Sequence, residues 1–327
     1  MAAHSRSTIF HGSEWARVLA ETYGHVPQYV CRFDLGRLIE ALPIMEVNSW
    51  WKGRRGVSLP FTDSCGPICE QNADGCELYQ KAVDCGRERR WKFFECRDSS
   101  PSWDGAKPSL EFYGHVVNLE VGADRVFKGM DSSIRRGVRK AEAAGLKVEF
   151  SSDAESIRIY YDLHCQTRRR HGLPPQPFRF FENIQRYMLG AGKGFVAISR
   201  FEGQPASAAV FFRHGKEAMY KFGASNFSMQ QHRPNNLMMW EAMRRCAEEG
   251  VSSLNLGRSS LSNDGLRRFK LGLGAAEQKL QYAKYDFLSK QFVADVDRVE
   301  GWFNRVFSRM PLSMLRLAGA SLYPHLS

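Results

Sequence analysis

The chain has 327 residues, of which 43% are hydrophobic and 25% are charged, values that are ordinary for a soluble globular protein. No run approaches the roughly 20 apolar residues of a membrane helix, and the start MAAHSRSTIF lacks the apolar core of a secretory signal, so a cytoplasmic protein is expected. The formal net charge of +11 favours an anionic partner such as a phosphorylated cofactor, nucleic acid or an anionic membrane.

The first half reads as a helix, three strands, a polar loop, a second helix and a fourth strand. The periodicity predicts these elements at residues 13–24, 27–34, 38–49, 53–61, 76–90 and 91–97. Five of the eight cysteines fall between Cys65 and Cys96. They include no CxxC pair and their spacing matches no zinc module, so buried or incidental thiols and no metal are expected.

A basic helix links the two halves. The segment 130–150, MDSSIRRGVRKAEAAGLKVEF, predicts a helix that closes at Gly145. We place the domain boundary near residue 150.

The second half begins with two helices. Ser152 and Glu155 form a capping-box pattern, Gly172 and Pro174 end the first helix, and the second follows Pro177. Three strands then predict an antiparallel meander, followed by a helix, a strand, a short helix and a last strand. We place these seven elements at residues 194–201, 206–215, 217–226, 237–250, 251–260, 264–274 and 277–287.

The same order of elements therefore occurs twice, in residues 29–96 and again in residues 195–260. Two spans of nearly equal length with the same order favour a structural duplication. Chance agreement of two loosely read patterns is the alternative.

Several stretches resemble the BioF2-like acetyltransferases, whose relatives include Fem-type aminoacyltransferases and FemAB-like proteins of exopolysaccharide gene clusters. They are SIRRGVRKAEAAGLKV, QTRRRHGLPPQPFRFFENI, MYKFGASN, HRPNNLMMWEAMRRCAEEGVSSLNLGRSS, GLRRFKLGLGA and, in the first half, SLPFTDSCGP.

The resemblance implies an α/β (α+β) chain with two tandem GNAT-like domains, each a mixed, mostly antiparallel sheet flanked by helices. Residues 1–150 would be a degenerate N-terminal domain that includes the linking helix, residues 151–290 the acyltransferase domain, and residues 291–327 a helical tail. It also implies transfer of an acyl group from an acyl-CoA-type donor to an amine, for example on a polysaccharide or cell-envelope precursor. Acyl-CoA is expected as a co-substrate, with no tightly bound cofactor.

The helix start before Leu237 is the first predicted site, because a helix N-terminus binds phosphate through its N–H groups and dipole. In GNAT proteins this junction holds the pyrophosphate of coenzyme A, which implicates His232, Arg233, Asn235 and Asn236. The glycine-rich QxxGxG loop of ordinary GNAT enzymes is missing here. Plain helix capping by Asn and Pro is the alternative.

Two further sites follow from the resemblance. Arg258 ends a strand next to the GLRRFK helix, where ligands collect in α/β folds, and Lys270 matches a lysine that serves the active site of Fem-type enzymes. Tyr220 lies on the strand that supplies the backbone donor in GNAT domains. The alternatives are a solvated lysine and a core tyrosine, and Glu241, Asp264, His115 and His232 stay equal candidates for the general base.

Two other functions remain open. One is aminoacyl transfer from tRNA to a peptidoglycan precursor, although no sustained heptad run predicts the coiled-coil arm common in such enzymes. The other is a non-catalytic RNA- or glycan-binding protein, which the net charge permits. The C-terminal segment WFNRVFSRMPLSMLRLAGASLY fits either contact with a membrane surface or packing on the protein.

Overall fold

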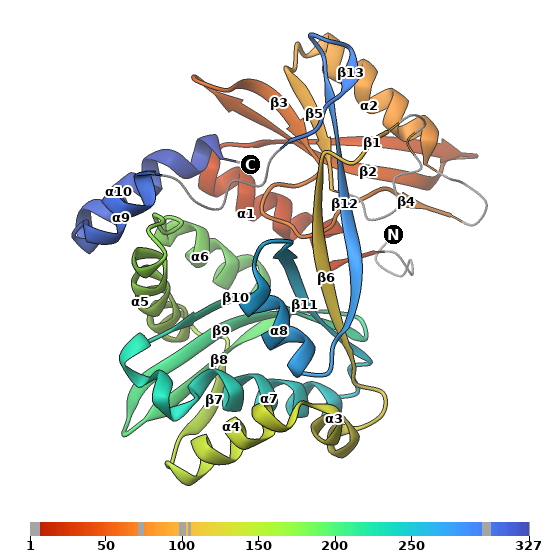
Figure 1. Cartoon of the computed structure of the whole chain (residues 1–327). Helices are drawn as coiled ribbons and strands as arrows, with labels where there is room; N and C mark the ends of the chain where they lie inside the picture. Colours follow the sequence, from red (N-terminus) through yellow and green to blue (C-terminus); the bar gives the residue numbers. More distant parts are fainter. Residues whose placement is uncertain (1–6, 71–74, 98–102, 104–105, 296–301, 327) are drawn as a thin grey trace. The chain divides into compact units, whose positions relative to one another are not determined.

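The computed structural model describes residues 7–70, 75–97, 103, 106–295 and 302–326. Two compact units account for the chain (Figure 1). Unit 1 comprises residues 1–112, 279–299 and 321–327, and unit 2 comprises residues 113–278 and 300–320. The chain passes from unit 1 to unit 2 within β6 (Leu110–Asn118) and returns within β12 (Ala276–Asp286).

Unit 1 is a sheet covered by helices. Its elements are η1 (Ile9–His11), α1 (Ser13–Tyr23), β1 (Val26–Asp34), β2 (Arg37–Ser49), β3 (Gly53–Val57), β4 (Ile68–Cys69), α2 (Cys76–Glu88), β5 (Phe93–Cys96) and β13 (Gln291–Phe292), and η4 (Tyr323–His325) ends it. The strands β1, β2 and β3 are antiparallel, whereas β3 pairs with β5 in parallel. Leu42, Ile44, Tyr79 and Phe94 form the centre of its core.

Unit 2 holds the second sheet, in the order β6-β11-β10-β9-β8-β7. Its elements are α3 (Ala123–Gly129), α4 (Ser132–Ala143), β7 (Lys147–Ser151), α5 (Ala154–Arg170), α6 (Phe178–Ile184), η2 (Gln185–Leu189), β8 (Gly194–Phe201), β9 (Gln204–His214), β10 (Glu217–Ser225), η3 (Phe227–His232), α7 (Pro234–Glu248), β11 (Ser253–Ser260) and α8 (Asp264–Gly272). The helices α3, α4 and α7 lie on one face of this sheet and α5 and α6 on the other (Figure 1).

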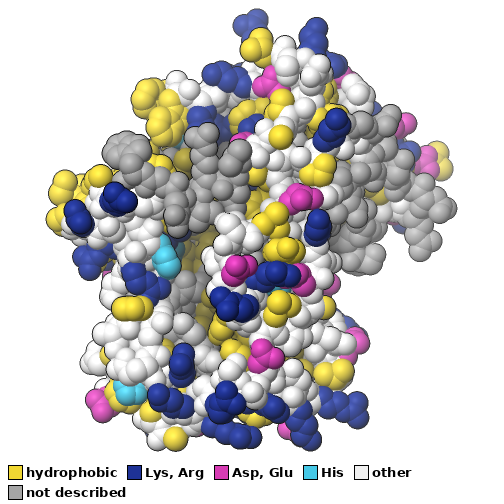
Figure 2. Space-filling model, in the orientation of Figure 1, with side chains coloured by type: hydrophobic (Ala, Val, Ile, Leu, Met, Phe, Trp, Pro, Cys, Tyr) yellow, Lys and Arg dark blue, Asp and Glu magenta, His cyan; other side chains and the backbone are white. Residues whose placement is uncertain are grey.

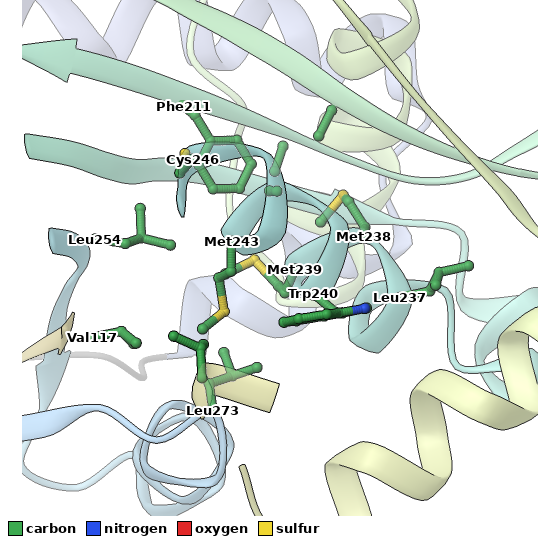
Figure 3. Close-up of a cluster of buried hydrophobic side chains, with 14 of the residues drawn as sticks. Val117, Phe211, Leu237, Met238, Met239, Trp240, Met243, Cys246, Leu254 and Leu273 are labelled. Carbon is green, nitrogen blue, oxygen red and sulfur yellow. The ribbon is translucent and has the colours of Figure 1, made fainter. Parts of the chain in front are cut away.

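The core of unit 2 forms where α7 packs on the sheet. Met239, Met243 and Cys246 of α7 lie in one buried cluster with Phe211 of β9 and Leu254 of β11 (Figure 3). These side chains are almost fully buried, and each contributes on the order of 1.5–3 kcal/mol by leaving water. The helix α7 is therefore held firmly against the sheet of unit 2.

The predicted repeat is confirmed by strand pairing. In unit 2, β8, β9 and β10 are antiparallel and β10 pairs with β11 in parallel, as β1, β2, β3 and β5 do in unit 1. The predicted fold class, a mixed and mostly antiparallel sheet flanked by helices, is likewise confirmed. The domain boundary near residue 150 stays a prediction. The two compact units are a different division of the chain, with boundaries within β6 and β12.

Two local predictions need correction. Asp153, not Ser152, caps α5, because its carboxylate accepts from the N–H of Ser156 at 2.7 Å. The strands β6 and β7 were not predicted, since residues 98–129 and the residues that follow the predicted helix end at Gly145 were left unassigned.

The segment after β13 contributes two helices, α9 (Trp302–Arg309) and α10 (Leu312–Leu322). Within the described residues, no helix has both the length and the hydropathy needed to cross a bilayer.

Candidate active site

The strands β10 and β11 separate in the middle of the second sheet. They pair only from Glu217 to Met219 and from Ser253 to Asn255, although β10 runs on to Ser225 and β11 to Ser260. A bulge at Lys221 also shifts the register of β10 against β9. Beyond Met219 the side of β10 that faces β11 therefore has no ladder partner in this fully described stretch. We call this region the β10–β11 opening.

A bend in β11 explains why the two strands part. Gly257 adopts a left-handed φ of 73°, which glycine tolerates without steric cost. The N–H of Gly257 donates to Oδ1 of Asn255 at 2.8 Å. Asn255 is the last residue of β11 that pairs with β10, so its side chain stabilises the bend that follows. The strand consequently turns away from β10 immediately after the last paired residue.

Lys270 fixes the bent end of β11. Its ammonium Nζ donates to the carbonyl oxygens of Gly257 and Arg258, each at 2.9 Å, and the residue is only 3% exposed. The two carbonyls are acceptors for a buried charge that would otherwise be costly. Lys270 is therefore a buried cation at the opening, which excludes the alternative of a solvated lysine.

A histidine and a carboxylate lie beside this cation. Nε2 of the fully buried His115 is 3.1 Å from Glu277, whose two oxygens accept from Arg267 at 2.7 and 2.8 Å. Burial, followed by the charge of Lys270, lowers the pKa of His115 despite the opposing effect of Glu277. The hydrogen bond from Arg267 lowers the pKa of Glu277. His115 is thus a neutral imidazole held in place by an ionised carboxylate.

A basic pocket of about 350 Å³ lies at the start of α7. It is lined by Ser133, Ile134, Arg136, Gly137, Lys140, Arg233, Asn236 and Phe269, which come from α4, α7 and α8. Arg136, Lys140 and Arg233 make no ion pair with any carboxylate in the described parts of the chain. Lys and Arg side chains gather over α4 in Figure 2.

The backbone at this helix start adds to the positive potential. Arg233 takes a left-handed φ of 60° and its side chain makes no capping hydrogen bond, while Pro234 occupies the first helical position. The N-terminus of a 15-residue helix carries about half a positive charge through its dipole. Three unpaired cations around such an end form a site suited to a phosphate or pyrophosphate.

Comparison with known proteins places this geometry in a family. A model of the acetyltransferase (GNAT) domain matches residues 128–280, which contain the opening, the basic pocket and Lys270. We call residues 128–280 the GNAT domain after this match. The match covers just under half of the chain and supports an acyltransferase of the GNAT type in that part of it. No curated protein matches the sequence.

Solved structures share the fold at low identity. FemX is 13% identical with a TM-score of 0.68, and the match covers 88% of this chain and 94% of the FemX chain. L-PGS from Bacillus licheniformis is 13% identical with a TM-score of 0.56, and the match covers 95% of this chain and 96% of that one. A tandem GNAT protein from the clavulanic acid biosynthesis pathway is 12% identical with a TM-score of 0.55, covering 80% and 83%. The predicted FemAB-like GNAT fold is thereby confirmed.

The GNAT domain brings together some of the residues predicted for donor binding. Arg233 and Asn236 line the basic pocket, whereas His232 and Asn235 are not among its lining residues. The ring of His232 stacks on Phe201 with 4.1 Å between centroids. Arg258 contributes its carbonyl oxygen to Lys270 and does not line the pocket.

Tyr220 packs against the core of the GNAT domain. Its ring is 5.5 Å from that of Phe211, and a Cβ at Gly223 would come within 1.8 Å of its hydroxyl oxygen. Burial raises the pKa of the phenol to about 12, so it stays protonated at neutral pH. A catalytic role for Tyr220 stays a prediction, and the core packing is what the structure describes.

Sequence reasoning missed the part that α4 plays in the site. Arg136 and Lys140 were noted only as members of a basic run, yet their i, i+4 spacing places both on the face that lines the pocket. That spacing is a visible signal. Its meaning depends on α7, which starts nearly a hundred residues later.

Proposed function

We propose that this protein is an N-acyltransferase that takes its acyl group from an acyl-CoA-type thioester and delivers it to an amine. The observation that carries the proposal is the basic pocket, in which Arg136, Lys140 and Arg233 surround the N-terminus of α7 and pair with no carboxylate among the described residues. The pyrophosphate of the donor would bind there. The remaining arm of the donor would extend into the β10–β11 opening.

The opening supplies what the chemistry needs next. A thioester carbonyl placed against β10 beyond Met219 can accept from a backbone N–H that has no ladder partner on that side. The acceptor amine then attacks the carbonyl carbon, the carbon–sulfur bond breaks, and the proton leaves the amine while the sulfur departs as a thiolate that takes up a proton. Backbone stabilisation of the tetrahedral intermediate is typically worth about 2.7–4 kcal/mol.

Lys270 and His115 would act at the wall of this opening. Lys270 holds the bent end of β11, so it fixes the width of the opening. Of the four candidate bases we favour the neutral, carboxylate-held His115, which is fully buried and would therefore take up the amine proton through water rather than directly. Asp264 and Glu241 lie on helix surfaces, and Glu241 is paired with Arg244.

The cations of the basic pocket would take over the role of the missing glycine-rich loop. Ordinary GNAT enzymes hold the pyrophosphate with successive backbone N–H groups, whereas here side-chain cations from two helices would supply the charge. The test is calorimetric titration of the protein with acetyl-CoA and with CoA. Saturable binding that weakens when Arg233 becomes Ala supports the proposal, and absence of binding to both compounds contradicts it.

The second candidate donor is an aminoacyl-tRNA. It is favoured by the further cations Arg135 and Arg139 on α4, which extend the positive surface beyond what a pyrophosphate needs. A transfer assay separates the two donors, because only the tRNA reaction is abolished by ribonuclease and persists without CoA. For either donor, the acceptor that we propose is an amine on a polysaccharide or on a cell-envelope precursor.

A further inference from the structure

The helix α10 has an unusual exposed face. Met314 is 55% exposed and Leu317 is 70% exposed, and the two lie one turn apart. The opposite face is anchored in unit 2 by the buried Leu315 and by Gly319, whose absent side chain lets the helix approach Pro175 closely. A surface helix normally turns polar residues to solvent, but α10 is apolar on both faces.

The neighbouring α9 continues this surface and adds charge. Phe303 is 38% and Val306 50% exposed, and Arg305 and Arg309 are exposed beside them. Neither arginine makes an ion pair within the described residues. Between residues 302 and 327 the sequence holds three arginines and no aspartate or glutamate.

An apolar groove adjoins the two helices. It has a volume of about 710 Å³ and is lined by Arg158, Tyr161, Asp162, Pro177, Phe178, Ser313, Arg316, Leu317 and Ala320. Arg316 lies at its edge, 2.8 Å from Asp162 and over the ring of Tyr161. Hydrophobic and basic side chains are mixed over α9 and α10 in Figure 2.

We propose that α9 and α10 dock this protein onto an anionic membrane surface. The exposed Phe303, Val306, Met314 and Leu317 would enter the boundary between headgroups and acyl chains, while Arg305 and Arg309 meet the lipid phosphates. The occupant is a lipid surface because an apolar stripe beside Arg305 and Arg309, on two helices that carry no acidic residue, matches an anionic bilayer in both polarity and charge. This role is independent of the donor that the enzyme uses.

The experiment is co-sedimentation of the full chain with vesicles of phosphatidylcholine alone or with 30% phosphatidylglycerol. Binding is expected to the anionic vesicles and to fall at high salt, because surface charges are screened. The variants M314E–L317E and R305E–R309E should each bind at least about tenfold less tightly, since each basic residue near an anionic surface contributes roughly a factor of five.

Two variants serve as matched controls in unit 1. L288E places a carboxylate at another exposed leucine, and R17E reverses an exposed arginine on α1. Both should bind vesicles like the unaltered protein, and all four variants should keep its melting temperature because the changed side chains are exposed.

Three results would overturn the proposal: equal binding to neutral and anionic vesicles, equal loss in the controls, or no vesicle binding at all. A dimer in light scattering that M314E–L317E dissociates, without vesicle binding, would assign the apolar face to a second copy of the chain instead.

Discussion

At the scale of single residues, Lys270 is the side chain on which the opening most depends. Lys270→Ala removes the donor for two buried carbonyl oxygens, so the bent end of β11 loses its anchor. We expect turnover to fall about 100-fold while donor affinity changes far less, because the basic pocket does not include Lys270. Steady-state kinetics and calorimetry measure the two effects separately. A further cost of roughly 1–3 kcal/mol in unfolding free energy is expected from the unpaired carbonyls.

The control for Lys270 lies two residues away. Arg268 is exposed on another face of α8, so Arg268→Ala should leave both turnover and stability near their original values. Lys270→Arg should recover only part of the rate, since a planar guanidinium does not place its charge as an ammonium does. Similar small effects of Lys270→Ala and Arg268→Ala would show that the anchor is unimportant for catalysis.

At the scale of helices and strands, the pairing of α4 with α7 creates the basic pocket. Arg136→Ala and Lys140→Ala should each weaken CoA binding by about tenfold. This loss is near the lower limit for a charge-assisted hydrogen bond, because both side chains are exposed to solvent. Arg139→Ala is the matched control, because Arg139 is exposed on the same helix but does not line the pocket. Calorimetric titration decides, and equal losses in all three variants would indicate a diffuse basic surface.

Gly137 tests the same helix contact without touching a charge. A Cβ here would come 2.7 Å from Nδ2 of Asn236, so Gly137→Ala must rotate that amide away from the pocket. Alanine in a helix interior is favoured over glycine by about 0.5–1 kcal/mol, which offsets the rearrangement.

We therefore expect unchanged or slightly higher thermal stability together with weaker CoA binding. A variant that binds CoA as before would show that the position of Asn236 does not matter to the donor.

The elements also show what sequence patterns can and cannot reveal. The bounds of β8 and β10 were predicted to within one residue and those of β9 and α7 to within two or three, because long apolar segments mark buried elements. The strand β6 was not, although it carries His115. Lys270 bonds to backbone carbonyl oxygens of β11. Because every residue type has a backbone carbonyl, this contact cannot be predicted from the sequence.

At the scale of the whole molecule, both units bury a neutral histidine. In unit 1, burial lowers the pKa of His25 to about 4, and in unit 2 burial, followed by the charge of Arg168, lowers that of His164 to about 3. His164 lies between the hydroxyl of Tyr160 at 3.1 Å and Oε1 of Gln176 at 2.9 Å. Protonation of His164 would therefore place a positive charge in the core, where neither of these two hydrogen-bond partners is a carboxylate.

The sign of the pH dependence follows from these values. The unfolded chain binds a proton at each histidine near pH 6.5, whereas the folded chain does so only near pH 4 and pH 3. The stabilisation is therefore complete above about pH 6.5 and is lost as the pH falls toward 3 to 4, at about 1.4 kcal/mol per pH unit for each histidine. Urea unfolding at pH 7.5, 6.0 and 5.0 should show this loss, and His164→Gln should reduce its slope by one proton. His214→Gln, at the last residue of β9, is the control and should keep the original slope, whereas an unaltered slope in His164→Gln would contradict the role of the buried imidazole.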